Sequence, residues 1–164
     1  MTDFTSPSAF HPLVAPDVAF SCLGTTIGKA GSREAFRKVD HDAVLLFAAA
    51  ARERRARTFV HVSSLGADRG SRVFYNSVKG ETEHDVARLG FPSVYALRPS
   101  ILDGEREESR PAERLGLAVA RVLGPLLGKY RPTPVESVAS AMIASAKASA
   151  PGVHVLEADA IFRG

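Results

Sequence analysis

The fold is decided by the stretch Val60-His61-Val62-Ser63-Ser64-Leu65-Gly66-Ala67-Asp68, which is followed closely by Phe74-Tyr75-Asn76-Ser77-Val78-Lys79-Gly80-Glu81. The first segment predicts a buried strand over residues 58–63 that ends in two hydroxyls, and the second predicts a helix that opens near Tyr75. Tyr75 and Lys79 are four residues apart, so their side chains share one helix face. An ammonium near a phenol favours the phenolate, and the Ser64 hydroxyl at the strand end can hold a carbonyl oxygen during proton transfer.

The rest of the chain alternates between short apolar runs and amphipathic stripes. We expect strands at 18–23, 58–63, 93–97 and 153–157, and helices at about 32–55, 75–89, 111–127 and 134–146. Strands that alternate with helices indicate an α/β fold with a mostly parallel sheet. The 164 residues show no linker or repeat, so we expect a single domain over residues 1–164, with an irregular segment at 1–16.

Local signals refine the helices. Ser32 is the expected N-cap of the first long helix, and Asp40 sits beside its apolar stripe, as a structural hydrogen bonder or as a residue that supports the site. Thr133-Pro134-Val135-Glu136 has the pattern of a capping box. The packing stripe expected behind it consists of Val135, Val138, Ala139, Met142, Ile143 and Ala146.

Polar residues follow three of the expected strands. These are Gly24-Thr25-Thr26, Ser63-Ser64 and Pro99-Ser100. In parallel α/β sheets the carboxyl ends of the strands gather the functional groups. We therefore expect the three segments to converge on one edge of the sheet.

Several short segments together resemble the short-chain dehydrogenase/reductase superfamily. The segments are Cys22-Leu23-Gly24-Thr25-Thr26, Lys29-Ala30-Gly31-Ser32, Val62-Ser63-Ser64-Leu65-Gly66-Ala67-Asp68, Val78-Lys79-Gly80-Glu81, Leu97-Arg98-Pro99-Ser100 and Glu108-Ser109-Arg110-Pro111. In this order they resemble the atypical, NAD(P)H-binding branch that contains the HIV Tat-interacting oxidoreductase and its bacterial relatives. The resemblance covers residues 18–157 and implies a Rossmann-like, three-layer α/β/α fold.

The resemblance also implies a function, that of an NAD(P)(H)-dependent oxidoreductase acting on a carbonyl/alcohol pair. Ser64 would position the substrate oxygen, Tyr75 would be the general acid/base, and Lys79 would bind the nicotinamide ribose and favour ionisation of the tyrosine. The cofactor, NADP(H) in preference to NAD(H), would be lined by Leu23, Gly24, Thr25, Thr26, Ser63, Lys79, Pro99, Ser100 and Ile101. No metal is implied, and the substrate stays open.

Relative to this family the chain looks N-terminally truncated, because the first strand, the glycine-rich phosphate loop with its helix, and the second strand have no match. The spacing of Gly24, Gly28 and Gly31 allows a phosphate-loop interpretation, but the resemblance aligns them with a later strand. We expect the strand at 18–23 to have a bare edge that a homodimer partner, another chain or the N-terminal segment covers. A non-catalytic regulatory or protein-interaction module is therefore the alternative function.

Composition sets the remaining expectations. The net charge of +3 gives no argument for a nucleic-acid partner, and Arg52, Arg54, Arg55 and Arg57 are expected to face water at a helix end. The single cysteine, Cys22, is expected to be a small buried hydrophobe in a reducing compartment. Without an apolar stretch long enough to span a bilayer or a signal-peptide pattern, we expect a cytoplasmic protein with no membrane partner.

Overall fold

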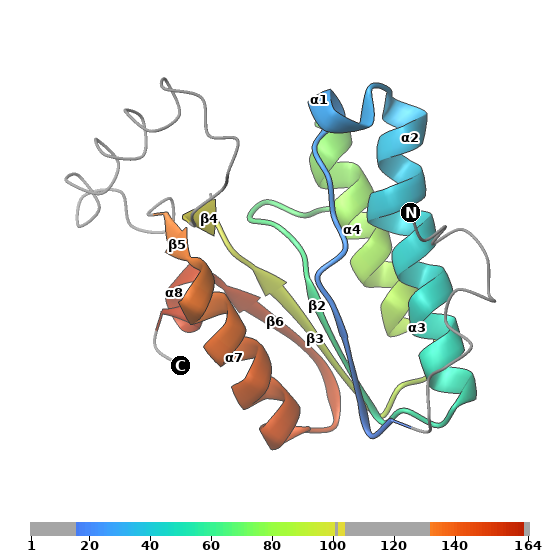
Figure 1. The fold of residues 1–164 in the computed structure, drawn as a ribbon, viewed down its shortest axis with the longest axis vertical. Coiled ribbons are helices and arrows are strands. Elements are labelled where there is room, and N and C mark those ends of the chain that lie inside the picture. The colour runs from blue at the N-terminus through green and yellow to red at the C-terminus, as the bar shows by residue number, and fades with distance from the viewer. Residues whose placement is uncertain (1–15, 101, 104–131, 163–164) are drawn as a thin grey trace.

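A computed structural model describes residues 16–100, 102–103 and 132–162. Its main sheet has four parallel strands in the order β1-β2-β3-β6. These strands are β1 (Val18–Ser21), β2 (Thr58–Val62), β3 (Ser93–Arg98) and β6 (Gly152–Glu157). A separate parallel pair joins β4 (Leu102–Asp103) to β5 (Thr133–Pro134). The expected parallel α/β sheet is confirmed, with β1 at one edge of its described part (Figure 1).

Helices cover both faces of this sheet (Figure 1). One layer contains α1 (Ile27–Ala30), α2 (Arg33–Arg37), the π-helical turn η2 (Lys38–Ala43), α3 (Val44–Glu53) and α4 (Phe74–Ala87). The opposite layer contains α7 (Val135–Ala148) and α8 (Ala158–Ile161). The arrangement is the expected three-layer α/β/α sandwich.

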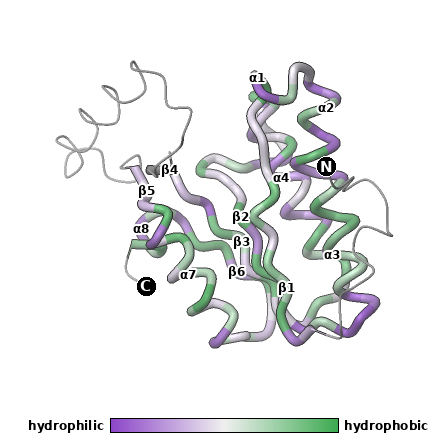
Figure 2. The backbone as a smooth tube through the Cα atoms, in the orientation of Figure 1, coloured by the Kyte–Doolittle hydropathy of each residue, from purple (hydrophilic) through white to green (hydrophobic). Residues whose placement is uncertain are grey.

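Successive side chains of a strand point to opposite faces of the sheet, and the apolar ones form two cores, one on each face. Phe59 belongs to the core beneath α3 and α4, which also contains Ala19, Val44, Ala48, Ala51, Ala56, Val86, Phe91 and Val94. Its neighbour Val60 points the other way, into a core with Tyr95, Leu97, Val138, Ala141, Met142 and Ile161. Figure 2 shows the resulting hydrophobic strands between helices of mixed polarity.

The first long helix is interrupted. Ser32 caps α2 as expected, and its hydroxyl accepts a hydrogen bond from the backbone N–H of Ala35 at 3.0 Å. The chain then continues through the π-helical turn η2 before α3, an interruption that the apolar stripe does not predict. Of the four arginines expected to face water, Arg55 and Arg57 are exposed. Arg52 and Arg54 are half-buried and donate to backbone carbonyls, those of Gly90 and Ala50 respectively.

The expected capping box before α7 is wrong. Pro134 occupies the N-cap position without a side-chain hydrogen bond, and Thr133 instead pairs with Leu102 in the small sheet. The expected packing stripe is wrong in part, since Val135, Ala139 and Ile143 are exposed. The face that packs consists of Val138, Ala141, Met142 and Ser145. The packed face of the helix therefore includes the polar Ser145, which a stripe of apolar residues leaves out.

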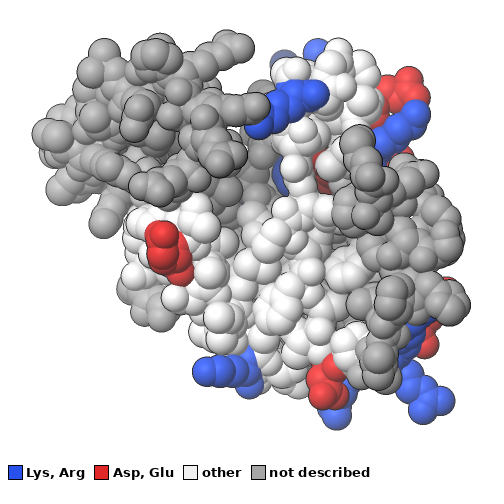
Figure 3. Space-filling model, in the orientation of Figure 1, with Lys and Arg blue, Asp and Glu red and all other residues white. Residues whose placement is uncertain are grey.

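On the face shown in Figure 3, the described Lys and Arg side chains lie near the two ends of the molecule and uncharged residues fill the middle. None of the helices in the described ranges combines the length and the apolar character that crossing a bilayer requires.

Candidate active site

The carboxyl ends of β2 and β3 stay paired beyond the strands themselves. The backbone N–H of Ser63 donates to the carbonyl of Leu97 at 2.7 Å, and that of Leu65 donates to the carbonyl of Pro99 at 2.9 Å. Ser64 lies between these two bonds, so its backbone is held against the end of β3. A hydroxyl placed this way sits on a rigid part of the scaffold.

A cavity of about 640 Å³ opens at this edge of the sheet. Its lining contains every described residue that the sequence predicts for the site, namely Leu23, Gly24, Thr25, Thr26, Ser63, Ser64, Tyr75, Lys79, Pro99 and Ser100. The prediction for Ile101 falls outside the described residues. Of the glycines in the phosphate-loop interpretation, Gly24 lines the cavity, whereas Gly31 adopts a positive φ of 81° as the C-cap of α1.

Helix α4 carries Tyr75 and Lys79 to the cavity. It crosses the loop after β2 at very short range: a Cβ on Gly80 would lie 2.2 Å from the backbone nitrogen of Arg69. Only glycine permits this approach, which brings the first turns of α4 beside the segment that carries Ser64. Tyr75 is half-buried, with its ring centroid 5.4 Å from that of Phe36.

Lys79 forms an ion pair at the cavity wall. Its Nζ atom lies 2.7 Å from Oδ1 of Asp40, with side-chain exposures of 8% for the lysine and 0% for the aspartate. The second carboxylate oxygen of Asp40 accepts a hydrogen bond from the backbone N–H of Thr25 at 2.8 Å. The sequence allowed two interpretations of Asp40, as a structural hydrogen bonder or as a residue that supports the site. The only signal was its position beside the apolar stripe of the helix.

Ser63 is less open to a ligand than its neighbour. It is buried, and its hydroxyl donates to the Glu83 carboxylate on α4. Arg98 at the end of β3 binds both oxygens of Glu83 and also reaches Glu157 at 3.0 Å. These bonds to Glu83 and Glu157 raise the pKa of Arg98. Sequence reasoning missed this network, whose members are far apart in the chain.

Ser100 is anchored from the small sheet. The Thr133 hydroxyl accepts from the backbone N–H of Ser100 at 3.2 Å and lies 3.0 Å from the Ser100 hydroxyl. Thr133 itself is fully buried. The residue expected to cap α7 instead fixes one wall of the cavity.

Cys22 corrects another expectation. The side chain is exposed and lines the cavity, rather than being a buried hydrophobe. Its Sγ atom lies 3.8 Å from Sδ of Met142 on α7, and partial burial raises the pKa of the thiol. Burial alternates along β1, with Phe20 exposed and Ser21 buried, and Cys22 follows as the next exposed position.

His61 lies within the sheet behind Lys79. It is 2% exposed, and its Nε2 atom makes no hydrogen bond with any described residue. Burial, reinforced by the Lys79 charge, lowers the pKa of His61 to about 3. The imidazole is therefore neutral at physiological pH.

The residues present leave space for a cofactor beside the ion pair. Gly24 brings backbone close to the ion pair, because a Cβ there would lie 3.4 Å from Oδ1 of Asp40 and 3.6 Å from Nζ of Lys79. The cavity volume falls in the range of small-molecule sites. Within the described ranges, His, Cys, Asp and Glu form no cluster of three or more suited to a metal ion.

Solved structures share this architecture. The dTDP-4-dehydrorhamnose reductase of Bacillus anthracis, in complex with NADP, matches with a TM-score of 0.68 and 18% identity over 98% of this chain and 68% of that chain. RMD from Pseudomonas aeruginosa, complexed with NADPH, matches with a TM-score of 0.70 and 16% identity over 96% and 66%. The chain therefore has a Rossmann-type fold, as the sequence predicts.

Curated proteins match more closely in sequence. The mitochondrial protein fmp52 of Emericella nidulans is 47% identical over 114 residues, which are 70% of this chain and 47% of the relative. The mitochondrial protein fmp52-1 of Aspergillus terreus is 37% identical over 153 residues, which are 93% of this chain and 63% of the relative. The chain spans about half the length of the first of these relatives. No protein-family model matches the chain.

These relatives correct two expectations. Their names place them in mitochondria, which contradicts the cytoplasmic location predicted from the missing leader pattern. That prediction was wrong because it relied on the absence of a signal. The relatives are also named fmp52 rather than Tat-interacting oxidoreductase, so the resemblance holds at the level of the Rossmann-type fold and not of that narrower subgroup.

Proposed function

We propose that the chain binds a nicotinamide dinucleotide and acts as an oxidoreductase on a carbonyl/alcohol pair, with NADP(H) preferred over NAD(H). The observation that carries the proposal is the shared cavity: Ser64, Tyr75 and Lys79 line one space at the carboxyl ends of the strands. This edge is where ligands bind in open α/β sheets. Two solved structures with this fold are complexes with NADP or NADPH, which agrees with the proposal.

Three residues of the chain would each have a separate role in the reaction. The Ser64 hydroxyl would donate a hydrogen bond to the carbonyl oxygen and fix its position. Tyr75 would deliver its phenolic proton to that oxygen during reduction and recover it during oxidation. Lys79 would hold the ribose hydroxyls with its ammonium donors. The bound nicotinamide would supply or accept the hydride.

A non-catalytic module is the second candidate. It is favoured by the Lys79–Asp40 ion pair, because the lysine that would hold a cofactor is bound to a buried carboxylate of the chain itself. On this alternative the cavity would bind no dinucleotide, and the chain would act through protein contacts.

Cofactor binding separates the two candidates. Thermal unfolding of the purified chain is followed with NADPH, NADH or neither. A ligand that binds the native state raises the melting temperature, so we expect stabilisation by the cofactors, larger with NADPH. The absence of a shift with either cofactor at millimolar concentration would reject the oxidoreductase and favour the module.

A tyrosine variant then tests the chemistry. NADPH consumption is measured with a panel of aromatic aldehydes and ketones as probe substrates. Tyr75→Phe removes only the phenolic oxygen, so we expect turnover to be abolished while the Kd for NADPH stays within about twofold. Equal loss of turnover and affinity would contradict the role given to Tyr75.

A further inference from the structure

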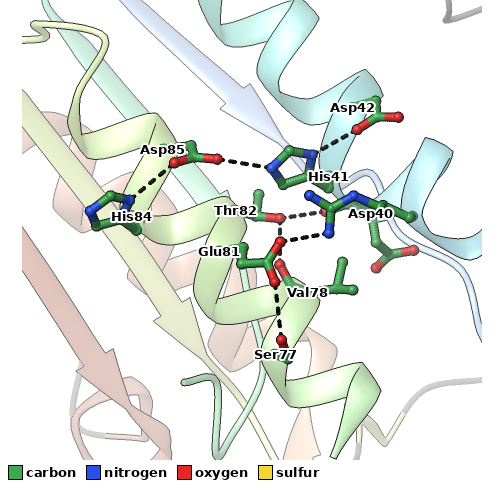
Figure 4. Close-up of polar contacts among 10 residues, drawn as sticks. Asp40, His41, Asp42, Ser77, Val78, Glu81, Thr82, His84 and Asp85 are labelled. Carbon is green, nitrogen blue, oxygen red and sulfur yellow. Dashed lines mark hydrogen bonds and ion pairs between the residues drawn. The ribbon is translucent and has the colours of Figure 1, made fainter. Parts of the chain in front are cut away.

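The π-helical turn η2 turns two adjacent polar side chains inward. Asp40 is 0% exposed and its neighbour His41 is 7% exposed, although both lie on a helix that covers the sheet. π-Helical turns are rare and occur frequently at functional sites. Here the two adjacent side chains bind different residues of α4. Asp40 contacts Lys79 at 2.7 Å. His41 contacts Asp85 (Figure 4).

Asp40 connects three segments of the candidate site. Its carboxylate pairs with Lys79 on α4 and accepts from the backbone of Thr25 after β1. Its carbonyl oxygen accepts a hydrogen bond from the Thr82 hydroxyl at 2.9 Å, one turn further along α4. Both side chain and backbone of Asp40 are therefore bound to elements that line the cavity.

The next residue of the turn, His41, also binds α4. His41 places Nε2 at 3.0 Å from the Asp85 carboxylate and Nδ1 at 2.7 Å from Asp42 (Figure 4). Hydrogen bonds from His84 and His41 lower the pKa of Asp85, which keeps this carboxylate charged. One turn earlier, Glu81 on α4 accepts from Arg37. The turn η2 is thus held against α4 on both sides of Asp40.

The position of the Lys79 ammonium depends on Asp40. A lysine has a long, flexible stem, and its end adopts one position only when a partner fixes it. Burying a charged group as deeply as the Lys79 ammonium is also costly unless an opposite charge is paired with it. Asp40 supplies both the partner and the opposite charge. The ammonium lies next to Gly24, and both residues line the cavity.

We propose that Asp40, held in place by the π-helical turn and by Thr82, is a positioning residue that fixes the Lys79 ammonium for binding the cofactor ribose. The inference rests on the proposed function and deepens it. It differs from a structural role in one respect: the effect of Asp40 on cofactor affinity passes through Lys79.

A double-mutant cycle measures that dependence. The Kd for NADPH is determined by fluorescence titration for the wild type, Asp40→Asn, Lys79→Met and the double variant. We expect Asp40→Asn to weaken NADPH binding roughly tenfold and Lys79→Met to weaken it at least as much. The double variant should bind within about twofold of Lys79→Met, because the second substitution has nothing left to disturb.

Two results would overturn parts of this proposal, and they are distinguishable. A wild type that binds neither NADPH nor NADH would remove the proposed function, and the inference with it. A wild type that binds NADPH, with single-variant losses that multiply in the double variant, would leave the function standing and reject the positioning role.

A second pair of variants covers the case in which Asp40→Asn fails to fold. Thr82→Val removes the hydroxyl that binds the Asp40 carbonyl but keeps the side-chain shape, whereas the control Thr82→Ser keeps the hydroxyl. We expect Thr82→Val to weaken NADPH binding about threefold relative to Thr82→Ser. Equal Kd values for the two variants would overturn the proposal.

Discussion

Glu83 on α4 and Arg98 at the end of β3 form a two-pronged ion pair, with Nη2 2.6 Å from Oε2 and Nε 2.9 Å from Oε1. Both side chains are largely buried, and the Ser63 hydroxyl donates to the same carboxylate. The pair therefore joins α4 to the ends of two neighbouring strands. Ser63 directly precedes Ser64 in the chain, so the pair supports the backbone that presents the Ser64 hydroxyl.

Neutralising Glu83 should destabilise the fold. Glu83→Gln keeps the shape but leaves Arg98 with only Glu157, and we expect a loss of about 2 kcal/mol in the free energy of unfolding, below the range for fully buried pairs. Urea unfolding measures it. The matched control is Arg88→Met, at an exposed arginine that follows α4, with an expected change within about 0.5 kcal/mol. Equal losses in the two variants would mean that the ion pair contributes nothing specific.

Gly80→Ala should be among the most damaging single substitutions. The added Cβ would meet backbone atoms of Asp68 and Arg69 at 2.2 to 2.6 Å, and backbone cannot move aside as a flexible side chain can. We expect a loss of about 3 kcal/mol or more. The control is Gly28→Ala in α1, where a Cβ meets nothing within 4 Å and alanine favours the helix. A Gly80→Ala chain as stable as the control would refute the close crossing of α4 and the loop.

His61 should make the fold acid-sensitive. Its pKa is lowered to about 3, so between pH 6.5 and 3 the unfolded chain binds a proton at this residue and the folded chain does not. Stability is therefore lost as the pH falls, by about 2 kcal/mol from this group between pH 7 and 5. His61→Leu should lose less stability than the wild type over that interval. Parallel pH profiles of unfolding free energy in the two proteins would contradict the neutral, buried imidazole.

Much of this architecture can be predicted from the periodic spacing of apolar residues in the sequence. The strand at β2 and the helix at α4 were predicted within two residues, because a short apolar run and a helical stripe each have one stable placement in a parallel sheet. The face of α4 that packs against the rest of the fold includes Val78, Thr82 and Val86, which are buried. Convergence of the segments after β1, β2 and β3 on one cavity also agrees with the rule for strand ends.

The features that sequence reasoning missed depend on contacts between distant segments. The π-helical turn at Asp40 is stabilised by Thr82, 42 positions later, and no local pattern encodes that bond. The role of Thr133 is set by Ser100, which overrides its capping signal. The face of α7 that packs includes Ser145, and a polar residue gives no signal in a search for an apolar stripe.

The most direct test of the proposed cofactor site uses Cys22, the single cysteine of the chain, whose side chain lines the cavity. The alkylation rate of its thiol by iodoacetamide is measured with and without NADPH, with Cys22→Ser as the control for labelling elsewhere. With NADPH at about ten times its Kd, we predict alkylation about tenfold slower, because about nine tenths of the chain would be occupied. An unchanged alkylation rate at NADPH concentrations that raise the melting temperature would place the cofactor elsewhere and contradict the assignment of this cavity.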